Sequence, residues 1–353
     1  MIKIEQRIAG YIDSLANDEL FLGSGSSLFG ELFREYINIT INPKTPLNKR
    51  LSDKINKLLL EKENHNSACD LSASKSYMQL LCFYLSYRNY YDVYKWNGDI
   101  AKEISLMPVR DYLESHGCHL GLPGSGNFAM FFAILIYNDT RNPSDSRLDE
   151  WFDFMDDSMN EKGLWGSLHN TYQMQNGYHQ YEVYNYFNRE PRVVIDYTAI
   201  LKSQDTMGHF GPRIGGGGCY DYDAVSLLCR SDNSNHIRKP LLKLLNSLII
   251  EQNVDGGFCE SVYIKSYFTS LWPVLKYTAL NFNIPRLKSA IRFLCFYKSF
   301  ELLETHWSQS HRKFSQSDLW DTWFRLMTIY KIEARLKGIP DRSKVFKFPG
   351  IGF

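Results

Sequence analysis

The chain has 353 residues, with 40 lysines and arginines against 39 aspartates and glutamates and a formal net charge of +1. This length can bury the core of one large domain or of two ordinary ones. The balanced charge argues against a nucleic-acid-binding protein that works through a basic face. Aromatic residues make up 15% of the chain, enough to fill wide helix interfaces or to line a pocket.

Membrane-spanning and disulfide-rich classes are also disfavoured. The longest apolar run, residues 128–137, is too short to cross a bilayer. The first twenty residues mix charges with apolar residues at helical spacing, which is not the pattern of a signal peptide. The seven cysteines are scattered and contain no C-x-x-C pair. We therefore expect a cytoplasmic protein with reduced thiols and no transmembrane segment.

The pattern of apolar residues is helical along the whole chain, and no run alternates as a strand would. Two segments at the N-terminus, 2–16 and 27–37, are expected to pack as helices on the outside of the main domain. Six pairs of helical segments follow them. The pairs are 47–63 with 73–88, 109–117 with 124–137, the segment from Leu148 with 177–188, the segment from Val194 with 219–230, the segment from Leu241 with 266–280, and 286–300 with 317–332.

The joints of three consecutive pairs repeat one design, in which a glycine turn ends in an aromatic residue. Aligned on Trp165, Phe210 and Phe258, the joints lie 45 and 48 residues apart. A period of this length is typical of a helical-pair repeat. We therefore predict an all-α protein, an α/α toroid of about six helical hairpins, with an open superhelix of the same pairs as the alternative. The predicted parts are a helical N-terminal extension at 1–45, the toroid at 46–335 and an extended C-terminal tail at 336–353, which lies across the surface or acts as a lid.

Two of these joints read Q-x-x-x-G-x-F, namely QDTMGHF at 204–210 and QNVDGGF at 252–258. A third, MNEKGLW at 159–165, keeps the glycine and the aromatic residue. The motif resembles the glutamine–tryptophan repeat of squalene and terpene cyclases and the related turns of protein prenyltransferase β-subunits, over about residues 145–260. Both families are α/α toroids, so the resemblance implies a closed ring. It also implies that Gln204 and Gln252 tie a helix end to the next turn through side-chain hydrogen bonds, a structural role.

Four glycines and two aspartates stand together in GGGGCYDYDAV, residues 215–225. The glycines allow a sharp turn, and Asp221 is then expected near the N-cap of a helix, where a carboxylate accepts hydrogen bonds from free N–H groups. Class II terpene cyclases carry D-x-D-D at the start of such a helix. DYDA resembles this motif in its first and third positions and departs from it at Ala224. The resemblance implies that Asp223 is a general acid and Asp221 its orienting partner, whereas a plain helix cap is the structural alternative.

Other polar and aromatic residues stand at the starts of the second helices of pairs, which in a closed ring would converge on one mouth. His179 and Glu182, three residues apart and so on one helix face, are further catalytic candidates. The predicted substrate-binding residues are Asn127, Trp165, Tyr181, His209, Arg213, Tyr222, Tyr267, Trp320 and Asp321.

The sequence predicts no protein metal site. A prenyltransferase-like zinc site would need a histidine on a late helix, where 317–324 has none, and the HGCH cluster at 116–119 would need ligands from elsewhere. The tetraglycine turn beside Arg213 also resembles an anion cradle. Two carboxylates in the same turn would repel a phosphate unless Mg²⁺ bridged them, so Mg²⁺ is the one cofactor that the pattern allows.

Acidic groups with aromatic walls suit two kinds of substrate. Aromatic faces stabilise a carbocation through cation–π attraction, which favours acid–base chemistry on a small-molecule isoprenoid or lipid-linked substrate. The same groups suit a carbohydrate-active toroid enzyme, such as a lyase, an epimerase or a glycosidase. A non-catalytic binding scaffold is the third alternative, and the sequence identifies no protein partner.

Overall fold

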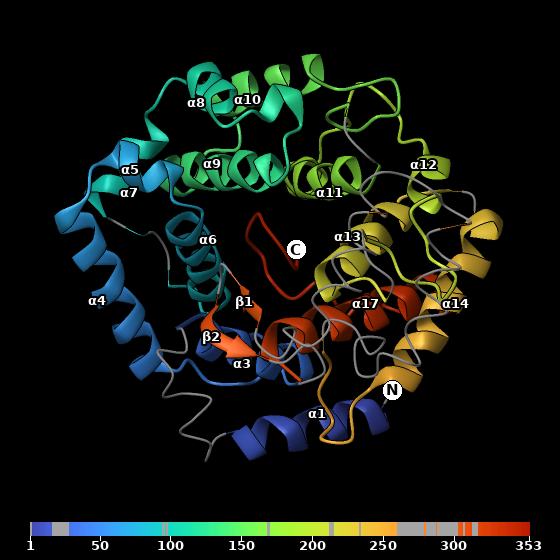
Figure 1. Ribbon diagram of the computed structural model, residues 1–353. Coiled ribbons are helices and arrows are strands. Elements are labelled where there is room, and N and C mark those ends of the chain that lie inside the picture. Colours follow the sequence, from blue (N-terminus) through green and yellow to red (C-terminus); the bar gives the residue numbers. More distant parts are fainter. Residues whose placement is uncertain are drawn as a thin grey trace. The chain divides into compact units, whose positions relative to one another are not determined.

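The computed structural model describes residues 2–15, 28–93, 96, 98–167, 170–211, 215–232, 234–259, 279, 287, 303–305, 308–312 and 317–353. Within these residues the regular structure is helical, apart from one antiparallel hairpin of β1 (Leu303–Thr305) and β2 (Ser308–Arg312) (Figure 1). The predicted all-α class is therefore confirmed. The predicted helices 266–280 and 286–300 lie outside the described residues, apart from one position in each.

The chain divides into two compact units, and each unit joins two separate stretches of sequence. The first unit combines residues 1–45 with 200–343, and the second combines 46–199 with 344–353. The segment predicted as an N-terminal extension thus packs with the second half of the chain, and the last ten residues return to the second unit. Closure of the helices into a ring stays a prediction.

Three long helices form the centre of the second unit: α6 (Lys75–Tyr90), α9 (Ser125–Thr140) and α11 (Asn170–Tyr186). α9 packs against both of the others, so the three lie side by side in chain order (Figure 1). α4 (Lys49–His65) packs against α6, while α7 (Asp99–Ser105) and α10 (Ser146–Asp157) pack against α9. The short helices α5 (Ala68–Ala73), α8 (Val109–Ser115) and η1 (Cys118–Leu120) connect them.

The pattern of apolar residues differs between α4, which is buried on one side, and the central helices α9 and α11. α4 buries Leu51, Ile55 and Leu59, which recur every four residues and form a single apolar stripe. α9 and α11 are buried on nearly all sides, and α11 accordingly includes buried polar residues within its span.

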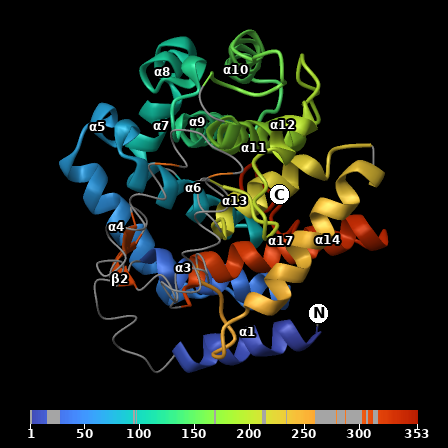
Figure 2. The same cartoon turned by 45° about the vertical axis from the view of Figure 1, so that its right-hand side comes forward.

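The first unit has a similar core, in which α17 (Leu319–Lys337) packs against both α13 (Gly218–Leu228) and α3 (Leu28–Ile41) (Figures 1 and 2). α1 (Ile2–Leu15) packs on α3, and α14 (Ser234–Glu251) packs on α17. The short helix α12 (Tyr197–Leu201) spans the division between the units.

The three predicted joints share one hydrogen-bonding scheme; we call residues 159–165, 204–210 and 252–258 the first, second and third turns. In each, the backbone N–H of the second residue donates to the carbonyl of the sixth, over 2.8, 2.7 and 2.9 Å for Asn160, Asp205 and Asn253. The N–H of the turn glycine donates back to the carbonyl of that second residue, over 3.0 to 3.1 Å. The repeat inferred from the sequence is therefore a structural repeat.

The two glutamines have the same structural role, as predicted. Nε2 of Gln204 donates to the carbonyls of Gly208, over 2.8 Å, and of Pro240 in α14, over 3.0 Å. Nε2 of Gln252 donates to the carbonyls of Gly256, over 2.8 Å, and of Ile4 in α1, over 3.3 Å. Each glutamine thus closes its own turn and attaches that turn to another helix, α14 for Gln204 and α1 for Gln252. α1 has the same relation to the third turn that α14 has to the second.

The third turn contacts the start of α17, although the two are far apart in the sequence. The N–H of Asp318, the N-cap residue of α17, donates to the carbonyl of Phe258 over 3.0 Å. α17 thus packs on α14 and contacts the third turn. The segment predicted to pair at this turn, 266–280, lies outside the described residues apart from one position, so its pairing stays a prediction. α1 and α3 pack against each other within the first unit, and their predicted place on the outside of the main domain stays a prediction.

The C-terminal tail, residues 344–353, packs across the C-terminal parts of the three central helices of the second unit. Phe346, Phe348 and Phe353 lie against Tyr90 of α6, Tyr137 of α9 and Tyr186 of α11, with ring centroids 6.1, 6.0 and 4.9 Å apart. The tail is therefore an ordered segment at the end of these helices that is remote from their N-termini, where a lid over the predicted mouth would have to lie.

Candidate functional site

The glycines of 215–218 bring the start of α13 close to two other elements. Gly216 has φ of +60°, and a β-carbon there would lie 2.5 Å from the Phe210 carbonyl oxygen, so only glycine fits. A β-carbon on Gly218 would lie 2.7 Å from Asp321 Oδ1 of α17, and the N–H of Gly218 donates to that oxygen over 2.8 Å. The glycines thus let α13 start against the second turn and α17, and the conformational role predicted for them is supported.

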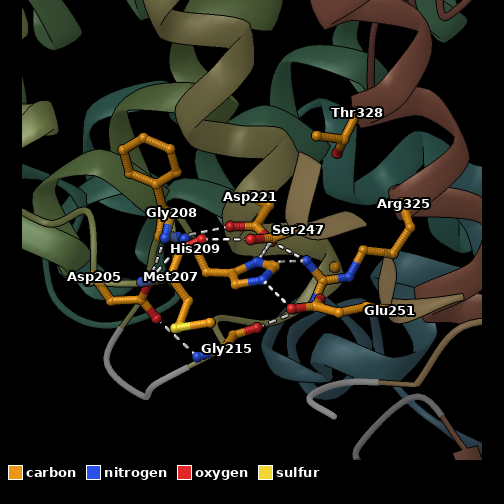
Figure 3. Close-up of polar contacts among 12 residues, drawn as sticks. Asp205, Met207, Gly208, His209, Gly215, Asp221, Ser247, Glu251, Arg325 and Thr328 are labelled. Atoms are coloured by element: carbon orange, nitrogen blue, oxygen red, sulfur yellow. Dashed lines mark hydrogen bonds and ion pairs between the residues drawn. The ribbon is translucent and has the colours of Figure 1, made fainter. Parts of the chain in front are cut away.

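Asp221 is the centre of a buried polar network (Figure 3). Its Oδ1 accepts the backbone N–H of Phe210 over 2.6 Å, and its Oδ2 accepts from His209 Nδ1 over 2.7 Å. Arg325 of α17 also donates to Oδ2 and, over 3.1 Å, to the carbonyl of Gly215. The structural alternative for Asp221 was a plain helix cap, but the N-cap residue of α13 is Gly217 and the carboxylate of Asp221 binds the second turn.

α17 repeats this contact with a hydroxyl group. Thr322 is the fourth residue of α17, as Asp221 is of α13, and its Oγ1 accepts the N–H of Phe258 from the third turn over 3.0 Å. The repeat therefore needs one acceptor at the fourth position of the helix. The sixth position carries Asp223 in α13 and Phe324 in α17, so the repeat needs no carboxylate there.

His209 lies between two carboxylates, with Nδ1 against Asp221 and Nε2 2.9 Å from Glu251 Oε1. Burial opposes protonation, but the charges and hydrogen bonds of Asp221 and Glu251 outweigh it and raise the pKa of His209 to about 9. His209 is thus an imidazolium at neutral pH and donates from both ring nitrogens. The 3.2 Å approach of Arg325 Nη1 to His209 Nδ1 then joins two donors that share one carboxylate and is not a hydrogen bond.

Asp205 completes the network from within the second turn. Its Oδ1 accepts the N–H groups of Met207, Gly208 and His209 over 2.8 to 2.9 Å, and its Oδ2 accepts that of Gly215 over 2.8 Å. Burial raises the pKa of Asp205, against the effect of His209 and of these hydrogen bonds. The network holds the turn, α13, α14 and α17 together. Apart from Asp205, the negative charges of Asp221 and Glu251 balance the positive charges of His209 and Arg325.

The sequence did not identify three members of this network. Asp205 aligns with Asn160 and Asn253 in the other turns, so the alignment of the repeats could have indicated its role. Glu251 directly precedes the third turn, and its contact with the second turn has no signal in the sequence. Arg325 has only a weak signal, as a basic residue within an apolar stretch of helix.

Several predicted substrate-binding residues of the first unit have structural contacts. Asp321 binds the start of α13, and His209 belongs to the network. Tyr222 lies against Phe324, with centroids 5.6 Å apart, and Trp320 packs edge-on against Phe33, with centroids 4.8 Å apart. Arg213 and Tyr267 lie outside the described residues.

Trp165 and Tyr181 of the second unit are buried and pack against each other, with ring centroids 5.7 Å apart. Trp165 Nε1 donates to the carbonyl of Met155 over 2.7 Å, and Tyr181 Oη donates to that of Gly163 over 2.9 Å. These two predicted substrate contacts therefore support the first turn. Asn127 of α9 and His179 and Glu182 of α11 are also buried in this unit.

Within the described part of the chain, no three His, Cys, Asp or Glu side chains gather as a metal site would require. His116 of the HGCH cluster instead contacts the carbonyls of Tyr112, over 2.8 Å, and Ser72, over 3.2 Å. Of the helices in the described residues, none is long and apolar enough to cross a membrane.

Comparisons of the chain with models of protein families, with curated proteins and with solved structures found no match.

Proposed function

We propose that this chain is an enzyme that uses Asp223 as a general acid–base group on an isoprenoid or other lipid-linked substrate. The observation that supports this role is the comparison of α13 with α17. Asp223 is 1% exposed, and the equivalent residue of α17 is Phe324. Burial of a carboxyl group costs free energy, and the repeat does not require one at this position. A buried carboxyl group without a role in the repeat is a candidate for chemistry.

In this proposal Asp221 is a positioning residue. Its contacts with the second turn, His209 and Arg325 fix the start of α13, two residues before Asp223. Aromatic rings beside this helix, such as those of Tyr222 and Phe324, suit the stabilisation of a cationic intermediate. The proposal includes closure of the helical hairpins into an α/α toroid, as the resemblance of the glutamine turns to those of terpene cyclases implies.

The division of roles between the two aspartates can be tested without knowledge of the substrate. Asp221→Asn removes the charge that Arg325 and His209 share, and we expect a loss of about 3 to 5 kcal/mol of unfolding free energy. Asp223→Asn should cost clearly less than this, because the equivalent position of α17 is Phe324 and the repeat needs no carboxylate there. If Asp223→Asn destabilises the protein as much as Asp221→Asn does, Asp223 is a structural residue and the proposal is wrong.

The chemistry is tested by incubating the full-length protein with polyprenyl diphosphates, squalene-type polyenes and polyprenyl-linked sugars and analysing the products by mass spectrometry. Asp223→Asn should lower the rate of product formation by about 100-fold or more, the range for loss of a general acid. Ser226→Ala, a buried position one turn further along α13, is the matched control and should keep the wild-type rate. Equal rates for wild type and Asp223→Asn would exclude Asp223 as the acid.

A further inference from the structure

The three central helices of the second unit direct one face each toward the C-terminal tail. A β-carbon on Gly350 of the tail would lie 3.6 Å from Ser86 Oγ of α6 and 3.3 Å from Ile134 Cδ1 of α9. Tyr186 of α11 packs against Phe353, with ring centroids 4.9 Å apart. Ser86, Ile134 and Tyr186 therefore mark the faces of α6, α9 and α11 that turn toward the tail.

A polar residue stands seven positions before each of these three contacts. Gln79 precedes Ser86, Asn127 precedes Ile134, and His179 precedes Tyr186 by this spacing. Seven residues are about two turns of an α-helix, so each polar residue lies on the same face as the tail contact, nearer the N-terminus of its helix. The common face of the three helices thus has an apolar part that the tail covers and a polar part beyond it.

The polar part is buried and holds atoms whose hydrogen-bonding capacity is unused. Gln79, Asn127 and His179 are 2%, 4% and 5% exposed. Among the described residues, neither Oε1 of Gln79 nor Nδ1 of His179 has a hydrogen-bond partner. Buried polar atoms of this kind cost about 1 to 3 kcal/mol each and are rare in folded proteins. Neither atom supports the packing of the tail, and a bound ligand that carries hydrogen-bonding groups would satisfy both.

The chemistry of these groups selects the kind of ligand. Burial, with the charge of Lys75, lowers the pKa of His179 to about 3, so the imidazole is neutral. A neutral imidazole and two side-chain amides offer donors and acceptors without charge, the combination that pairs with hydroxyl groups. Glu182, three residues after His179 on the same side of α11, and Lys75, whose charge acts on His179, carry opposite charges, so the surroundings favour an uncharged ligand over an ion of either sign.

We propose that Gln79, Asn127 and His179 form a binding site for a polyhydroxyl ligand, such as a sugar. The site lies on the common face of α6, α9 and α11. It uses residues of the second unit alone and does not depend on the role of Asp223. The proposal therefore stands or fails separately from the proposed acid–base chemistry.

Binding can be followed with imidazole-labelled [¹⁵N]histidine protein, in which His179 is assigned by its absence from the His179→Phe spectrum. Glucose, galactose, N-acetylglucosamine and myo-inositol, each at up to ~50 mM, are the probes, with inorganic phosphate as the anionic comparison. We expect at least one polyol to shift the His179 Nδ1 resonance with saturation. Gln79→Leu should weaken that binding by about 10-fold or more, the loss of one hydrogen bond to the ligand.

Gln180→Leu is the matched control. Gln180 is 1% exposed and its Oε1 also has no hydrogen-bond partner among the described residues. Successive residues of an α-helix point about 100° apart, so Gln180 lies on the opposite side of Asn176 from His179, and Asn176 contacts Gly126 of α9. Gln180→Leu should therefore keep wild-type affinity.

The stability of the variants gives a second readout. His179→Phe replaces a polar atom without a partner by an apolar group and should raise the melting temperature by about 2 to 4 °C while it abolishes binding. The proposal is overturned if no polyol shifts the His179 resonance, if phosphate alone does so, or if Gln180→Leu weakens binding as much as Gln79→Leu.

Discussion

The protonation of His209 makes the stability of the first unit depend on pH in an unusual range. The pKa of His209 is raised from 6.5 to about 9 in the folded protein, a difference of about 2.5. At about 1.36 kcal/mol for each pKa unit, the protonated histidine contributes about 3 kcal/mol to the unfolding free energy. Because the folded pKa is the higher one, this contribution is complete below pH 6.5. It falls as the pH rises and is absent well above pH 9.

The prediction is tested by urea unfolding of wild type and His209→Gln between about pH 6 and 10. Glutamine does not titrate, and the titrations of other groups cancel when the two proteins are compared. Their difference in unfolding free energy should be constant near pH 6 and decrease by about 3 kcal/mol by pH 10. Hydrogen exchange of the α13 amides assigns the effect to the first unit.

An NMR titration of the His209 ring gives the same pKa directly, since a midpoint near 9 is expected. A stability difference that is flat over this pH range, or that grows with pH, would refute the argument. In that event the imidazole is neutral at neutral pH, and only one of its two ring nitrogens donates to a carboxylate.

Two further predictions concern the turns and the tail. Gly256→Ala should destabilise the first unit by more than about 1 kcal/mol in thermal unfolding, since φ is +99° and a β-carbon would lie 2.0 Å from the Arg7 carbonyl oxygen. Gly10→Ala in α1, with nothing within 4 Å of the added carbon, is the control and should be neutral or stabilising. Phe348→Ala, at a site 1% exposed, should cost about 3 to 5 kcal/mol and increase deuterium uptake in α9; unchanged uptake would show that the tail does not support that helix.

The local features of this fold could be predicted because their causes are local. Helical periodicity places most of the described helices, and the repeated motif is sufficient to predict the hydrogen bonds of Gln204 and Gln252 within their turns. In these two bonds each glutamine reaches a carbonyl four residues further along the chain. The glutamine recurs in two aligned turns and the glycine and aromatic residue in three, which makes the motif easier to detect than any single pair of residues.

The features that could not be predicted involve residues far apart in the chain. Arg325 reaches Asp221 across 104 positions, and Phe258 meets α17 although 59 residues separate it from Asp318. In chain order the nearest predicted helix after the third turn is 266–280. A prediction that pairs neighbouring segments therefore assigns this segment to the third turn. The packing of α1 beside the third turn is equally remote, since it joins residues 248 positions apart.

The comparison of Asp221 with Thr322 shows which contacts of Asp221 belong to the repeat and which are additional to it. A hydroxyl group suffices to bind the N–H of the turn aromatic, as Thr322 does. A carboxylate performs the same task with one oxygen and leaves the second for His209 and Arg325. The additional charge therefore links α14, through His209 and Glu251, and α17, through Arg325, to the start of α13. Burial of these charged groups costs desolvation free energy. Such a cost is expected where the position of the first residues of α13 matters for function. The residue two positions further along the same helix is Asp223, so the fixed helix start and the proposed acid belong to one arrangement.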